Sequence, residues 1–119
     1  MRLKDYFNKN FYTKDRHEID GLRTHYYHGR VEQVTEGVCD VLKQDGCIIR
    51  AVDTDRHEIS FDNKDYQGTV VLTATSFTEI ACDINVLTFN ILPTAKGVKV
   101  IERLYSMLDK RLELKKVGA

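Results

Sequence analysis

The sequence has one proline, no tryptophan and no long apolar run. A helix that spans a membrane needs about 20 predominantly apolar residues, and no segment approaches that length. Residues 1–20 also lack the apolar stretch of a secretory signal. We therefore expect a cytoplasmic protein with no membrane association. Internal repeats, low-complexity tracts and linkers are absent as well.

Cysteine is scarce, and the net charge is zero. Cys39, Cys47 and Cys82 are odd in number, widely spaced and set among apolar residues, which predicts reduced core thiols and argues against a disulfide framework. The 18 basic and 18 acidic residues cancel, so no overall field attracts DNA, RNA or an anionic membrane.

The length and composition are those of one globular domain. The chain has 119 residues, of which 42% are hydrophobic and 30% are charged. A chain of this size supports one hydrophobic core. We therefore expect residues 1–119 to form a single α+β domain.

Two segments near the N-terminus have helical spacing. Leu3, Phe7 and Phe11 recur every four residues, which predicts a short helix over residues 2–12. Apolar residues recur at helical spacing again over residues 31–43, and they predict a second helix there although Gly37 weakens it. We expect the N-terminal part to be largely helical.

The middle of the chain predicts an antiparallel sheet of four to five strands. Residues 22–28 are rich in tyrosine and threonine, and four further segments combine β-branched residues with polar turns between them. The predicted strands are residues 22–28, 47–52, 57–62, 69–75 and 80–92.

Residues 95–114 predict a long C-terminal helix. Thr94 can cap it after Pro93, and one continuous apolar stripe needs a partner surface. The stripe consists of Val98, Ile101, Leu104, Tyr105, Leu108 and Leu112. Because the sheet offers the only large apolar face, we expect a two-layer sandwich in which a curved sheet packs on this helix. The order of elements resembles the helix-grip and TATA-binding-protein-like arrangements, which implies a fold and no particular activity.

Asp53, Asp55, His57 and Glu58 form the densest polar cluster. A calcium loop would need glycine where Glu58 stands and glutamate where Lys64 stands. A solvated hairpin tip is the simpler interpretation. If the chain is an enzyme, general acid–base catalysis by His57 with Asp55 or Glu58 is the best available hypothesis, but no catalytic or nucleotide-binding motif supports it.

A second group comprises His17, His25 and His28. Together with Cys39 they lack the close, repeated spacing of zinc ligands. On a strand, His25 and His28 would face opposite sides of the sheet. We therefore expect no metal site and no cofactor.

The leading hypothesis for function is a non-enzymatic binding or interaction domain that forms a homodimer. Aromatic residues gather in the first quarter of the chain, more than so short a segment easily buries. Basic residues lie among them, as single-stranded nucleic acid would require, but interspersed acidic residues argue against nucleic acid as a partner. The expected dimer pairs either through a free strand edge or through an interface that consists of Leu3, Tyr6, Phe7, Phe11 and Tyr12.

An alternative hypothesis is a carrier for a small apolar ligand. If the sheet curves around the helix over residues 95–114, a cavity can open between the two layers. Its expected lining is Leu72, Ile84, Val86, Phe89, Ile101, Tyr105 and Leu108.

Overall fold

The fold is that of a computed structural model, which describes residues 10–89 and 96–119. Seven strands and two α-helices are described, with one short 3-10 helix. The elements are β1 (Asn10–Tyr12), η1 (Asp20–Leu22), β2 (His25–His28), α2 (Val31–Gln44), β3 (Ile48–Asp53), β4 (Glu58–Asp62), β5 (Tyr66–Ser76), β6 (Glu79–Thr88), α3 (Lys96–Arg111) and β7 (Glu113–Val117). The α+β class predicted from the sequence is confirmed.

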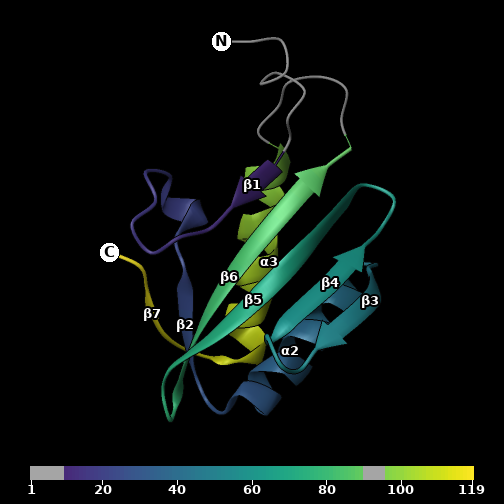
Figure 1. The fold of residues 1–119 in the computed structure, drawn as a ribbon. Helices are drawn as coiled ribbons and strands as arrows, with labels where there is room; N and C mark the ends of the chain where they lie inside the picture. The colour runs from purple at the N-terminus through teal and green to yellow at the C-terminus, as the bar shows by residue number, and fades with distance from the viewer. Residues whose placement is uncertain (1–9, 90–95) are drawn as a thin grey trace.

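All seven strands belong to one sheet, in which every strand pair is antiparallel. The order is β3-β4-β5-β6-β2-β7. One edge of β6 is shared, because β1 pairs with residues 85–87 and β2 with residues 79–82. The long β5–β6 hairpin therefore forms the centre of the sheet (Figure 1).

Both α-helices lie on the same face of the sheet. In Figure 1, α3 runs behind β5 and β6, while α2 lies behind β3 and β4. Their apolar sides pack against inward side chains of the strands and form one core. Core side chains less than 3% exposed include Val38 and Val41 from α2, Ile101 and Leu104 from α3, and Ile59, Val70 and Ile84 from the strands. No described α-helix covers the opposite face, which we call the open face.

Polar contacts attach α3 to the strands. The Tyr105 hydroxyl donates a hydrogen bond to the Cys82 carbonyl oxygen at 2.6 Å, and its ring stacks on His25 with a centroid distance of 3.7 Å. Asp109 lies 2.9 Å from His25 Nδ1 and accepts a hydrogen bond from the Tyr27 hydroxyl at 2.7 Å. These contacts fix α3 over β2 and β6.

The predicted number of strands was too low, because β1 and β7 were not expected. The helix predicted over residues 2–12 is wrong for residues 10–12, which form β1. Phe11 faces the core while Asn10 and Tyr12 are exposed, so the local period is two. The rest of that prediction, residues 1–9, lies outside the described residues.

The long C-terminal helix is shorter than predicted. It ends at Arg111, and residues 113–117 form β7 on the free edge of β2. Leu112 lies between them and packs against Gly37 of α2, where a Cβ atom would meet the Leu112 side chain at 2.6 Å. No helix in the described part of the chain is long and apolar enough to cross a membrane.

Candidate binding surface

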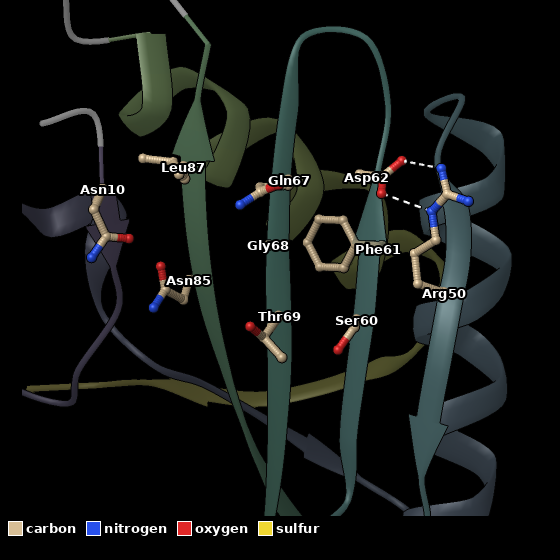
Figure 2. Close-up of a pocket in the computed structure, with 10 residues that line it drawn as sticks. All are labelled: Asn10, Arg50, Ser60, Phe61, Asp62, Gln67, Gly68, Thr69, Asn85 and Leu87. Atoms are coloured by element: carbon tan, nitrogen blue, oxygen red, sulfur yellow. Dashed lines mark hydrogen bonds and ion pairs between the residues drawn. The ribbon is translucent and has the colours of Figure 1, made fainter. Parts of the chain in front are cut away.

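Strand register aligns polar side chains in rows across the open face. Ser60 lies opposite Thr69, Thr69 opposite Asn85, and Asn85 opposite Tyr12. Partners directly opposite in a sheet point to the same face, so these four residues form one row, which we call the central row. The next row consists of Asp62, Gln67, Leu87 and Asn10. With Arg50, these eight residues make up what we call the open-face array, and Figure 2 draws all of them except Tyr12.

The open-face array carries almost no net charge. Its only charged members are Arg50 and Asp62, whose side chains form two hydrogen bonds of 2.7 and 2.9 Å. These hydrogen bonds from Arg50 hold the pKa of Asp62 below its ordinary value, so the carboxylate stays ionised and neutralises the guanidinium.

A shallow hollow of about 390 Å³ lies in the middle of the open-face array. Gly68 is needed there, because a Cβ atom at this position would lie 2.1 Å from the Asn85 carbonyl oxygen and 2.8 Å from the Phe61 ring. The Phe61 ring occupies the place of the missing side chain (Figure 2). Gly68 thus lets β5 approach β6 closely beneath the hollow.

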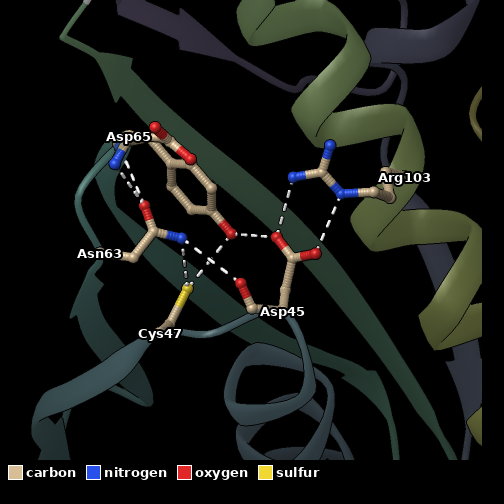
Figure 3. Close-up of polar contacts among 6 residues, drawn as sticks. Asp45, Cys47, Asn63, Asp65 and Arg103 are labelled. Atoms are coloured by element: carbon tan, nitrogen blue, oxygen red, sulfur yellow. Dashed lines mark hydrogen bonds and ion pairs between the residues drawn. The ribbon is translucent and has the colours of Figure 1, made fainter.

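A second polar network holds one end of β4 and β5 (Figure 3). Asp45, which follows α2, accepts two hydrogen bonds from Arg103 of α3 at 3.0 and 2.9 Å and a third from the Tyr66 hydroxyl. The Cys47 thiol donates a hydrogen bond to the Tyr66 hydroxyl oxygen. Asn63 Oδ1 accepts hydrogen bonds from the backbone N–H groups of Asp65 and Tyr66. The network ties both helices to the β4–β5 turn and so keeps the rows in register.

The protonation states in this network follow from burial and hydrogen bonding. Burial alone would raise the pKa of Asp45, but hydrogen bonds from Arg103 and Tyr66 outweigh it and hold the pKa below its ordinary value. Burial, followed by the hydrogen bond to Asp45, raises the pKa of Tyr66. Tyr66 therefore remains a hydrogen-bond donor to an ionised carboxylate.

The residues predicted to line a carrier cavity lie mostly in the core. Phe89 is half exposed, whereas the other six are at most 2% exposed and pack in the same hydrophobic cluster. Those six are Leu72, Ile84, Val86, Ile101, Tyr105 and Leu108. None of the seven lines the hollow of the open-face array.

The residues predicted to form a dimer interface are divided. Leu3, Tyr6 and Phe7 lie outside the described residues. Phe11 packs against the core near Gly97 of α3, while Tyr12 is 50% exposed and belongs to the open-face array.

The polar clusters singled out from the sequence form no metal site within the described ranges 10–89 and 96–119. No hydrogen bond or ion pair joins His57 to Asp55 or Glu58 there. His25 is buried and His28 exposed, as the strand alternation predicts. No group of three His, Cys, Asp or Glu residues in these ranges is placed to hold a metal ion.

The open-face array was not predicted. Its members stand at alternating, outward positions of separate strands, and only the register shows that they adjoin. Comparison with known proteins adds no assignment: no family model matches the chain, and no curated protein matches it.

Proposed function

We propose that this protein is a non-enzymatic interaction domain that forms a homodimer through its open-face array. The supporting observation is a row-by-row alignment of uncharged polar side chains on the sheet face that neither described α-helix covers. Protein interfaces are depleted in charged residues at their centre. Ser60, Thr69 and Asn85 give the middle of the open-face array that character.

A second copy of the chain is the partner that this chemistry fits. In a two-fold dimer the same patch meets itself, so it must be complementary to itself. Amides and hydroxyls provide both donors and acceptors, and two neutral patches meet without repulsion between like charges. Tyr12, at the end of the central row, adds an exposed ring of the kind enriched at interfaces.

The test is the oligomeric state of variants that place a charge in the central row. We expect the wild-type protein to sediment as a dimer at high micromolar concentration. Thr69→Lys and Asn85→Lys each bring two like charges together across the two-fold axis, and each is expected to raise the dimer dissociation constant about tenfold or more. Sedimentation equilibrium over a concentration series measures this constant.

Ser106→Lys is the matched control, because Ser106 is exposed on α3, behind the sheet. It adds the same charge and should leave the dissociation constant unchanged. Circular dichroism checks that all variants are folded. A wild-type monomer at high micromolar concentration, or folded array variants that dimerise as well as Ser106→Lys, would contradict the proposal.

The carrier and enzyme hypotheses stay predictions. Native mass spectrometry of protein purified from cells tests the carrier, which should retain a bound mass. The contacts of the described residues favour the interaction domain, because they provide an uncovered polar surface and do not join His57 to a carboxylate.

A further inference from the structure

A second pocket, of about 330 Å³, lies between the first turn of α2 and the β3–β4 hairpin. It is separate from the open-face array, since its lining comes from the helix-covered side of the sheet and from the hairpin tip. We call it the hairpin pocket. The lining residues used below are Val31, Glu32, Val52, Asp53, His57 and Ile59.

The hairpin pocket has an apolar floor. Ile59 is 1% exposed and lies opposite Val52, which is 42% exposed. Val31, the first residue of α2, is partly buried beside the core. Because α2 begins at this point, the helix leaves part of the Val52 side chain uncovered. A ligand with an aliphatic chain would cover that surface.

The rim of the hairpin pocket is acidic. Glu32 comes from the helix and Asp53 from β3, and no lysine or arginine is among the described residues that line the pocket. The Glu32 carboxylate makes no hydrogen bond or ion pair within the described part of the chain. Asp53 Oδ1 accepts hydrogen bonds from the backbone N–H groups of Asp55 and Arg56. Asp53 Oδ2 lies 4.0 Å from the guanidinium group of Arg56, which is largely exposed.

His57 is the third polar group at the hairpin pocket. Its φ of 55° is a left-handed conformation, which glycine and asparagine adopt more readily. The turn therefore does not require an imidazole, yet the His57 side chain lines the pocket. No hydrogen bond engages this imidazole within the described ranges, so it is available to a ligand.

We propose that the hairpin pocket binds a small aliphatic amine. The alkyl chain lies on Val31, Val52 and Ile59, and the ammonium group lies between Glu32 and Asp53. Charge complementarity selects a cation over an anion, and the volume is at the small end of the range for small-molecule sites. The proposal does not depend on the open-face array or on dimerisation.

The experiment is a titration of the ¹⁵N-labelled protein with n-hexylamine, followed by the amide shifts in two-dimensional NMR spectra at neutral pH. We expect saturable shifts in residues 31–35 and 52–59. Two ligands with the same six-carbon chain, 1-hexanol and hexanoate, separate charge from chain length. The alcohol should bind more weakly than the amine, and the carboxylate should cause no saturable shift.

Glu32→Gln removes one charge from the rim and is expected to weaken hexylamine binding by about threefold or more. Glu36→Gln is the matched control, because Glu36 is exposed one turn further along α2 and does not line the hairpin pocket. No saturable shift with hexylamine, equal binding of all three ligands, or equal effects of the two substitutions would overturn the proposal.

Discussion

Asp45 shows how much of this fold can depend on one side chain. It is 13% exposed and is the common acceptor for Arg103 of α3 and Tyr66 of β5. A carboxylate in such surroundings is stable only while its partners remain. Arg103 and Tyr66 in turn depend on it, since removing Asp45 leaves the Tyr66 hydroxyl with a single thiol partner.

We predict that Asp45→Ala lowers the free energy of unfolding by about 2 kcal/mol at neutral pH, the usual scale for hydrogen bonds to a charged group. The pKa of Asp45 is lower in the folded state than its ordinary value of 3.8. Its contribution is therefore complete above pH 3.8 and is lost as the pH falls through the folded-state value. Urea unfolding at a series of pH values measures both effects.

The stability difference between wild type and Asp45→Ala should shrink in acid. Asp62→Ala is the comparison, because it removes a carboxylate from an exposed ion pair with Arg50 and should cost less at neutral pH. A difference for Asp45→Ala that is the same at neutral and strongly acidic pH would contradict the assignment.

At the scale of elements, hydrophobic periodicity predicted the central part of the fold. The five predicted strands correspond to β2 to β6, and the two longer predicted helices to α2 and α3. β3 has no buried residue, but each of the other elements has a buried side on which its apolar residues repeat with the period of the element. Burial of the apolar side of an element is the physical origin of the periodicity that predicts it.

The two strands that were missed lack such a signal. All five residues of β7 are exposed, so no alternation marks the strand, and its lysines continue the charged pattern of α3. β1 has only three residues, too few to show a period. Both are held by backbone pairing with β2 and β6, which the sequence of the segment itself does not encode.

The open-face array was hidden for a related reason. Outward residues of a strand are polar in most proteins, so Ser60, Thr69 and Asn85 look ordinary when each strand is considered separately. Their significance depends on register, which is set by the hairpin turns between them. Asp53 and His57 of the hairpin pocket, in contrast, belong to the polar cluster that the sequence shows, and this cluster does lie at the tip of the β3–β4 hairpin.

The contact between α2 and the end of α3 provides a prediction about elements. Gly37 in a helix interior costs about 1 kcal/mol relative to alanine, but a Cβ atom there would press on Leu112. Gly37→Ala should therefore be more favourable by about 1 kcal/mol in a Leu112→Ala background than in the wild type. Denaturant unfolding of the four proteins in this cycle measures the coupling, and strictly additive effects would refute the contact.

At the scale of the whole molecule, Cys82 reports on the integrity of the sheet. It lies in β6 between Leu72 of β5 and His25 of β2, and it is 0% exposed. Burial raises the pKa of its thiol, so both access and thiolate formation are suppressed. Cys39 is only partly buried, and burial raises the pKa of its thiol too.

We predict that iodoacetamide modifies Cys39 first and Cys82 only when the whole sheet opens. A variant with Cys39→Ser and Cys47→Ser isolates the Cys82 signal for mass spectrometry. Its modification rate should rise with urea in proportion to the unfolded fraction. Rapid modification of Cys82 without denaturant, in protein that remains folded, would show that β6 separates from its neighbours locally.

The position of β2 between β6 and β7 has a consequence for synthesis on the ribosome. His25 pairs with Cys82 on one side and with Val117 on the other, so both partners are translated long after it. At about 5–20 residues per second, the nascent β2 waits several seconds for β6 and longer for β7. During that interval its tyrosines and backbone groups are exposed to chaperones and to neighbouring nascent chains, and a ribosome that stalls before codon 113 leaves one edge of β2 unpaired.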